Sequence, residues 1–505
     1  MTPISAFSLP DWIDVASRSQ PDKLALSFAG NHWTFAELRR SVDAAAAVLT
    51  RASDANAGRI GILSANRPGF VFAVHAATRL AVSIVPLNWR QTADEIAWQL
   101  RDAGITQLIV DEERLAIAET ACADQLVTIV PVEDVERAPA NFGEMIDTPR
   151  IELGREAAIL YTSGTSGRPK GALITYGNLW FSAVASALHL GHEPDDVWLA
   201  AMPLFHVGGL SIVFRGVIGA TTVVLNERFD PARALVAIDE GATLVSVVPV
   251  MLQRMLDMRG DAAWPLHLRC ILVGGSSAPS RLIEECLRLG IPVAATYGLT
   301  EATSQVTTMR PSQAAGRPSS SGLPLPLTEV RITASTGNVM SGEIGLIEVR
   351  GPTLFAGYLE DSTARSSVSS DGWFQTGDAG YLDREGYLYV VDRRDDLIVS
   401  GGENVYPGEI ERVLSEHPLV VDAGVIGVAD EAWGSRPVAA VVWRGDRDTA
   451  NLNLLRHCEE RLSSYKVPDR IVVVPELPRS ASGKLLRRTL REQIANIPER
   501  PSTGV

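Results

Sequence analysis

Short apolar segments alternate with helical segments through the first half of this chain, and this alternation constrains the fold more than any other feature. Thr34 begins one helical segment and Glu37 stands three residues later, which is the pattern of a capping box. Strands that alternate with helices normally form parallel sheets covered by helices. The expected strands are residues 23–29, 59–63, 82–86, 107–110, 243–248, 270–275 and 292–297, and further expected helices are residues 69–79, 92–103 and 280–289.

The sequence pattern changes twice after this region, which predicts several parts. The length of 505 residues suggests about three domains or subdomains. Residues 311–327 are rich in Pro, Ser and Gly, and we interpret them as a solvated linker. We expect an α/β protein whose N-terminal domain, residues 1–394, contains parallel-rich αβα sheets and a β-rich subdomain at about 323–394. A small mobile α+β domain follows over residues 395–505, with a hinge in the charged join.

Composition and charge exclude several classes of protein. The formal net charge is −14, which disfavours nucleic acid as a general partner because phosphate binding needs a basic face. Four widely separated cysteines without a CxxC pair exclude a disulfide framework and argue against a zinc site. The first residues lack a basic start and an apolar core, and the longest apolar stretch, Leu210 to Leu225, is interrupted by Arg215. We therefore expect a cytoplasmic protein without an integral membrane segment.

The segment YTSGTSGRPKG, Tyr161 to Gly171, concentrates glycines, hydroxyl side chains and two cations in eleven residues. Glycines allow the backbone to approach an anion, and hydroxyl and N–H groups donate to phosphate oxygens. The segment is not a Walker A loop, because Lys170 follows a proline where that loop has glycine before lysine. A polar turn is the alternative interpretation, but the density of donors favours a phosphate site.

Five motifs in this order resemble the adenylate-forming superfamily, which contains acyl-CoA synthetases, peptide-synthetase adenylation domains and luciferases. The resemblance covers essentially the whole chain and rests on several segments spread over some 330 residues. These are YTSGTSGRPKG, then YGLTE at Tyr297 to Glu301, TGD at Thr376 to Asp378, DRRDDLIVSGGENVYPGEIE at Asp392 to Glu411, and PRSASGKLLR at Pro478 to Arg487.

This resemblance implies a two-step reaction that uses ATP, Mg²⁺ and CoA. A carboxylate attacks the α-phosphate of ATP to give acyl-AMP and pyrophosphate, and a thiol, usually of CoA, then displaces AMP. The motifs imply that Thr300 donates to the α-phosphate, that Glu301 holds Mg²⁺ and that Asp378 accepts the ribose hydroxyls. The implied nucleotide-binding residues are Thr162, Ser163, Gly164, Thr165, Ser166, Gly167, Lys170, Gly274, Gly275, Ser276, Thr296, Tyr297, Gly298, Asp378 and Arg393. Core packing is the alternative for Tyr297, and surface ion pairs are the alternative for Asp378 and Arg393.

The resemblance also implies a C-terminal domain that rotates about a hinge at Asp395. In the first step Lys484 would contact the α-phosphate and the attacking carboxylate. Rotation would then bring Gly401 and Gly402 to the site and open a passage for the CoA thiol. Trp433 resembles the aromatic residue that packs on the CoA adenine in some relatives, or it is a half-buried tryptophan beside a strand.

The segment Leu204 to Asp230 lies where this superfamily builds its acyl pocket, and it resembles the o-succinylbenzoate–CoA ligases of menaquinone biosynthesis. His206 would stand between the carboxylate and the pocket, Gly298 would line it, and the glycines at 208, 209 and 216 would leave room for a ring. Arg215 interrupts the apolar run, and a buried charge needs a partner. That partner is either an acidic residue of the protein or the second carboxylate of a dicarboxylic substrate.

The resemblance therefore predicts an ATP-dependent acid–CoA ligase, with o-succinylbenzoate as the first choice of acid. Another aryl, medium-chain or dicarboxylic acid would use the same chemistry. A free-standing adenylation enzyme that loads a carrier protein is a further alternative, although the chain contains no carrier domain. The sequence leaves the choice between a monomer and a homodimer open.

Overall fold

The computed structural model describes most of the chain and has the expected α/β architecture. The described residues are 7–52, 58–138, 150–162, 169–334, 337–359, 368–393, 396, 398–400, 403–430, 434–444, 447–462, 464–480 and 483–495. Thr34 caps its helix as expected: its hydroxyl accepts a hydrogen bond from the Glu37 N–H at 3.2 Å, and the Glu37 carboxylate accepts one from the Thr34 N–H at 2.8 Å. This reciprocal pair satisfies two N–H groups that the first helical turn leaves without partners.

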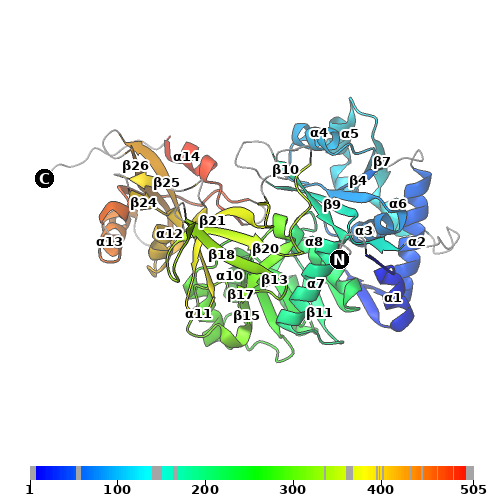
Figure 1. The fold of residues 1–505 in the computed structure, drawn as a ribbon, viewed down its shortest axis with the longest axis horizontal. Helices are drawn as coiled ribbons and strands as arrows, with labels where there is room; N and C mark the ends of the chain where they lie inside the picture. The colour runs from blue at the N-terminus through cyan, green and yellow to red at the C-terminus, as the bar shows by residue number, and fades with distance from the viewer. Residues whose placement is uncertain are drawn as a thin grey trace.

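Two large, mostly parallel sheets make up the N-terminal part (Figure 1). The nine-stranded sheet has the order β17-β16-β15-β14-β13-β11-β12-β2-β3, and the six-stranded sheet has the order β10-β9-β5-β4-β6-β7. The strands of the larger sheet are β2 (Leu24–Phe28), β3 (Asn31–Thr34), β11 (Val197–Ala200), β12 (Thr222–Leu225), β13 (Leu244–Val247), β14 (Cys270–Val273), β15 (Val293–Leu299), β16 (Ser304–Thr308) and β17 (Leu323–Pro324). Those of the smaller sheet are β4 (Arg59–Leu63), β5 (Ser83–Pro86), β6 (Gln107–Val110), β7 (Thr128–Pro131), β9 (Glu156–Thr162) and β10 (Lys170–Thr175), and β1 (Ser8–Leu9) pairs with β8 (Ile151–Glu152).

Helices fill the space between and around these sheets. The largest apolar cluster joins side chains of α1, α2, α3, α7 and α8 to strands of both sheets, so these helices form the shared core. The helices of this part are α1 (Trp12–Ser19), α2 (Phe35–Arg51), α3 (Pro68–Leu80), α4 (Ala93–Asp102), α5 (Leu115–Cys122), α6 (Val132–Arg137), α7 (Tyr176–Leu190), α8 (Val207–Ile218), α9 (Pro231–Asp239), α10 (Pro249–Arg259) and α11 (Ser280–Arg288). The strands and helices expected from the sequence alternation are confirmed to within a few residues at their ends.

A third, antiparallel sheet follows the Pro/Ser/Gly-rich segment. Its order is β19-β18-β20-β21-β22, with β18 (Glu329–Ala334), β19 (Gly337–Asn338), β20 (Gly345–Arg350), β21 (Phe374–Leu382) and β22 (Leu388–Arg393). The interpretation of residues 311–327 as a solvated linker is wrong for the part from Ser320 onward. Ser320 is only 2% exposed and donates to the Leu388 carbonyl at 3.0 Å, and Leu323–Pro324 pair with β16. This part packs into the protein, whereas Ser312, Ala315, Gly316 and Ser319 are exposed.

The C-terminal residues form a separate sheet of order β24-β23-β26-β25, with β27 beside β26 (Figure 1). Its strands are β23 (Ile398–Ser400), β24 (Glu403–Val405), β25 (Val420–Asp430), β26 (Gly434–Trp443) and β27 (Arg470–Val473), and its helices are α12 (Pro407–Ser415), α13 (Arg447–Glu459) and α14 (Arg487–Ala495). Among the described residues, no helix has both the length and the apolar character that crossing a membrane requires. All four cysteines of the chain are buried.

Candidate functional site

The carboxyl ends of β14 and β15 carry glycines of the predicted nucleotide site. Gly274 to Ser276 follow β14, and Gly275 has φ +80°, a conformation that strongly favours glycine. Gly298 lies near the end of β15, and a side-chain carbon there would stand 1.7 Å from the Ser304 carbonyl oxygen, so no larger residue fits. The carboxyl edge of an open parallel sheet is where ligands usually bind. The structure therefore brings two glycine-containing sites from the predicted nucleotide set to one edge.

A hydrogen bond ties this edge to the antiparallel sheet. The Tyr297 hydroxyl donates to Asp378 Oδ2 at 2.7 Å, and both side chains are largely buried. The Tyr297 ring also belongs to an apolar cluster with Val306 and Ile332. Asp378 faces Arg393 in the register of β21 and β22, so the backbone brings these two residues of the predicted ribose site side by side. Thr296, one residue earlier, uses its hydroxyl to bond the Thr307 carbonyl at 2.8 Å.

Tyr358, which the sequence motifs did not identify, contacts both Glu301 and Lys170. The Tyr358 hydroxyl donates to Glu301 Oε1 at 2.7 Å, and Lys170 Nζ lies 5.2 Å from the centre of the Tyr358 ring. Phe355 packs edge-on against Tyr358, and its N–H donates to the Glu301 carbonyl at 2.8 Å. The segment from Phe355 to Leu359 also pairs with β10, so it fixes Glu301 relative to the strand that begins at Lys170. Thr300 and Glu301 lie in a short 3-10 turn directly after β15.

Lys484 also lies at this edge, although it belongs to the C-terminal part. The Lys484 N–H donates to Ser480 Oγ at 3.1 Å, and the Lys484 carbonyl accepts from the Ser480 N–H at 2.7 Å, so its loop is closed on itself. Gly483 (φ +78°) rests against Val248, because a side-chain carbon at Gly483 would stand 3.4 Å from Val248 Cγ2. Val248 follows the carboxyl end of β13, so the loop of Lys484 covers the edge that carries Glu301.

His206 precedes α8 at the carboxyl side of β11. It is largely buried, and Nε2 has no hydrogen-bond partner among the described residues. Burial, with nearby Arg90, lowers the pKa of His206 to about 4, so the imidazole is neutral at neutral pH. A neutral ring with an unpaired nitrogen suits a residue that borders a substrate pocket.

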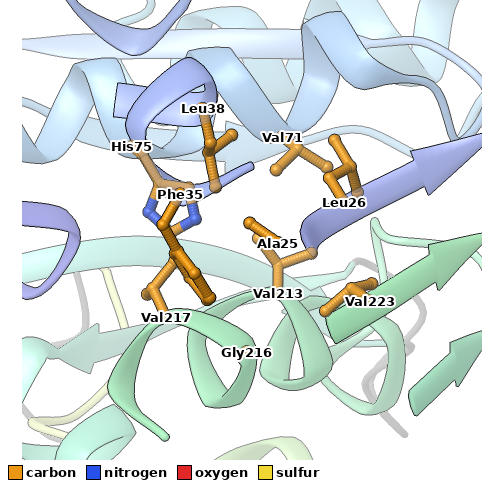
Figure 2. A pocket seen from close by; sticks show the side chains of 10 residues that line it. All are labelled: Ala25, Leu26, Phe35, Leu38, Val71, His75, Val213, Gly216, Val217 and Val223. Carbon is orange, nitrogen blue, oxygen red and sulfur yellow. The ribbon is translucent and has the colours of Figure 1, made fainter. Parts of the chain in front are cut away.

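The expectation that glycines of α8 leave room for a ring is wrong for two of the three positions. A side-chain carbon at Gly209 would stand 2.3 Å from the Pro203 carbonyl oxygen, and one at Gly216 would stand 2.6 Å from Val223 Cγ2. At Gly208 the neighbour is the flexible end of Met202, at 2.6 Å. These glycines let α8 approach its surroundings closely. Figure 2 shows Gly216 and Val223 beside a core cavity of about 10 Å³, too small for more than one water.

Arg215 lines a much larger cavity of about 560 Å³ between the C-terminal halves of α7 and α8. The guanidinium lies 5.2 Å from the Trp198 ring centre, and Nη2 is 3.5 Å from Ser182 Oγ. Arg215 is 6% exposed, and no described carboxylate forms an ion pair with it; its Nε and the hydroxyl of Ser186, which also lines the cavity, lack partners among the described residues. Burial lowers the pKa of Arg215 to about 10, which still leaves a cation at neutral pH.

A single serine links Arg215 to the segment that holds Glu301. The Ser182 hydroxyl, next to Arg215, donates to the Thr303 carbonyl at 2.7 Å, and Thr303 follows the 3-10 turn that holds Glu301. Of the two alternatives for Arg215, an acidic protein partner is not observed among the described residues, because Asp196, which lines the same cavity, pairs with Arg269 instead. The alternative of a substrate carboxylate remains a prediction.

Several predicted site residues lie outside the described residues. They are Ser163, Gly164, Thr165, Ser166, Gly167, Asp395, Gly401, Gly402 and Trp433. Thr162, at the end of β9, is described and is bonded to the Lys170 carbonyl at 3.5 Å. Tyr358 is the main residue that the sequence reasoning missed. It stands alone between a glycine and a leucine, and only its contact across the fold with Glu301 distinguishes it.

Comparisons with known proteins cover nearly the whole chain. The family model described as AMP-binding enzyme matches residues 13–359, and the model described as AMP-binding enzyme C-terminal domain matches residues 409–484. The 2-succinylbenzoate–CoA ligase of Bacillus mycoides is 40% identical over 497 residues, which cover 96% of this chain and 99% of that protein.

The o-succinylbenzoate CoA synthetase of Bacillus subtilis is similar in structure. Its complex with the acyl-adenylate intermediate has a TM-score of 0.89 at 39% identity and covers 96% of this chain and 98% of its own. Its complex with ATP and a magnesium ion has the same TM-score and identity, with 96% and 100% covered. A double mutant of that enzyme, bound with its product analogue, has a TM-score of 0.74 at 39% identity, with 96% and 99% covered.

Proposed function

The chain belongs to the AMP-binding enzyme family, and on that premise we propose that it is an ATP-dependent ligase that joins 2-succinylbenzoate to CoA. The acid attacks the α-phosphate of ATP to form acyl-AMP and release pyrophosphate, and the CoA thiol then displaces AMP. The observation that carries this proposal is likeness along the full chain to relatives named for this acid, at about 40% identity. No described feature favours a second function.

The arrangement at the carboxyl edge supports the nucleotide and metal roles in this proposal. Gly274 to Ser276 supply backbone at the end of β14 for the nucleotide, and Asp378 is the acceptor for the ribose hydroxyls. A magnesium ion prefers oxygen ligands, and Glu301 supplies a carboxylate at the end of β15. A carboxylate has about four acceptor sites, so the bond from Tyr358 leaves others for the metal. When bound, Mg²⁺ would neutralise charge on the phosphate oxygens.

We expect Tyr358→Phe to weaken magnesium binding while the protein stays folded. The phenol holds the Glu301 carboxylate at 2.7 Å, and loss of an outer partner of a metal ligand typically costs about tenfold or more in metal affinity. The measurement is the Mg²⁺ concentration that gives half-maximal adenylation. Tyr389→Phe, which removes a hydroxyl bonded to Asp383 at 3.4 Å, is the matched control. An unchanged magnesium requirement in Tyr358→Phe would argue against this role.

The C-terminal domain is proposed to serve both steps in turn. Lys484 would act in the first, from the loop that now covers the edge of the nine-stranded sheet. A rotation about Asp395 would then present Gly401, Gly402 and Trp433 to CoA for the second. We retain 394/395 as the proposed boundary between the two domains.

Arg215 is proposed to hold the second carboxylate of the acid. The helix α8 extends from His206 at the reacting edge to Arg215, nine residues later, which is about 13 Å along the helix axis. The arginine side chain reaches back over part of that distance, toward Ser182 and Thr303. A buried cation without an acidic protein partner is compensated by an anionic ligand.

The test is a panel of carboxylic acids with ATP, Mg²⁺ and CoA, read by mass spectrometry of the thioester. The panel contains 2-succinylbenzoate, benzoate, malonate and a medium-chain fatty acid. We expect 2-succinylbenzoate to give the highest kcat/KM. A different preferred acid would overturn the substrate assignment and leave the ligase reaction standing. Acyl-AMP without thioester for every acid would point instead to a carrier protein as the acceptor.

A further inference from the structure

Arg281, in the N-terminal part, forms hydrogen bonds with the C-terminal sheet. Arg281 on α11 donates from Nη1 to the Val420 carbonyl at 2.8 Å and from Nη2 to the Val421 carbonyl at 3.2 Å. These two carbonyls belong to the start of β25. Because a guanidinium presents several donors in one plane, a pair of bonds to neighbouring carbonyls fixes orientation as well as distance.

The next residue of β25 continues the contact toward the lysine loop. Asp422 accepts two hydrogen bonds from Arg479, from Nε at 2.9 Å and from Nη2 at 2.6 Å. The remaining terminal nitrogen of Arg479 donates to the Gly483 carbonyl at 2.7 Å. Gly483 directly precedes Lys484 and rests against Val248 of the N-terminal part. Arg281, Val420, Val421, Asp422, Arg479 and Gly483 thus form one continuous set of contacts, here named the docking network.

We propose that the docking network makes Arg281 and Arg479 positioning residues for Lys484 in the adenylation step. Arg281 holds the C-terminal sheet against α11. Arg479 bonds both Asp422 of that sheet and the Gly483 carbonyl, so it fixes the backbone beside Lys484 relative to the sheet. Any rotation of the C-terminal sheet away from α11 separates Arg281 from the two carbonyls. The network therefore stabilises only the orientation that places the lysine loop at the sheet edge.

This inference rests on the proposed function, because it assigns the network to the first of two half-reactions. The arrangement is also nearer to that of the B. subtilis enzyme with ATP or acyl-adenylate than to that of its double mutant with product analogue. A residue with a purely structural role would affect both half-reactions alike. A positioning residue for Lys484 affects adenylation alone.

The test compares the two half-reactions in Arg281→Ala, Arg479→Gln and the control Arg288→Ala. Arg288 lies on the same helix and is exposed. We expect both network variants to slow acid-dependent pyrophosphate release by roughly tenfold, the loss typical of hydrogen bonds made by a charged group. Thioester formation from added acyl-AMP and CoA should stay within about twofold of the parent. Equal slowing of both steps, or no slowing of either, would overturn the proposal.

A distance measurement provides a second readout that does not depend on catalysis. The native cysteines are buried, so cysteines introduced at exposed Leu266 and Arg488 take spectroscopic labels selectively. We expect Arg281→Ala to broaden the distribution of distances between these labels, and Arg288→Ala to leave that distribution unchanged. An unchanged distance in Arg281→Ala would refute the docking role. If the parent protein itself releases no pyrophosphate in an acid-dependent way, the proposed function fails instead, which separates the two failures.

Discussion

Lys484→Ala is expected to slow adenylation by about a hundredfold or more while transfer from preformed acyl-AMP continues at nearly the parent rate. Negative charge gathers on the α-phosphate as the carboxylate attacks, and a cation fixed in place before reaction stabilises that charge. The backbone N–H of Lys484 bonds to Ser480, and the preceding Gly483 contacts Val248, so the backbone of the lysine lies at the sheet edge. The two rates are measured separately, by pyrophosphate release and by thioester formation from added acyl-AMP.

The matched control is Arg488→Ala. Arg488 lies four residues further along the chain, its side chain is 86% exposed, and it forms an ion pair with Glu492 on the same helix. This control removes a cation from the same region without touching the loop, so both steps should remain at the parent rate. If Lys484→Ala slowed both steps to the same extent, the assignment of this lysine to the first step would be wrong.

Arg215→Met is expected to lower kcat/KM for 2-succinylbenzoate by about thirtyfold or more. Removing one partner of a buried charge pair typically costs about 2 kcal/mol or more, partly because the other charge is left without compensation. Methionine keeps an unbranched apolar stem in the cavity, so packing against Trp198 changes little. The measurement is thioester formation at limiting acid concentration.

The comparison acid is 4-oxo-4-phenylbutanoate, which has the same skeleton without the ring carboxylate. The parent should use it poorly, and Arg215→Met should use it about as well as the parent does. Arg215→Lys keeps a charge and is expected to recover part of the activity with the diacid. An equal loss with both acids would mean that Arg215 supports the fold of α7 and α8 rather than the substrate.

The fold was accessible from sequence wherever local patterns and tertiary packing agree. The strands β4 and β6 end in runs of buried apolar residues, up to Leu63 and Val110, as is typical of parallel strands whose sheet is covered by helices on both faces. The capping residues of α2 are determined by hydrogen bonds within a single turn, so they can be identified without tertiary information. In residues 311–327, by contrast, composition indicates solvent exposure, but Ser320 finds a backbone partner from residue 388. A contact over that separation is not encoded in the local pattern.

In the candidate site, too, local motifs identify some residues, whereas others are recognised only from contacts across the fold. Glu301, Asp378 and Lys484 stand in recognisable motifs, and the structure brings their segments to one edge of the nine-stranded sheet. Tyr358 has no local signature, because its significance arises only from the distance to Glu301. The glycines of α8 were misjudged for a related reason. A glycine in a sequence can indicate either open space or close contact, and only the positions of Pro203 and Val223 decide between them.

The burial of every cysteine protects the proposed acyl-adenylate from reaction with thiols of the protein itself. An acyl-adenylate is an acylating agent, and a thiolate within reach would capture its acyl group as a thioester. Burial raises the pKa of Cys270, Cys286 and Cys458 to about 12 and raises that of Cys122, so these sulfurs stay protonated as well as inaccessible. An enzyme built in this way carries no sulfur nucleophile of its own that competes with the incoming thiol, and self-acylation through cysteine is suppressed by the packing of its core.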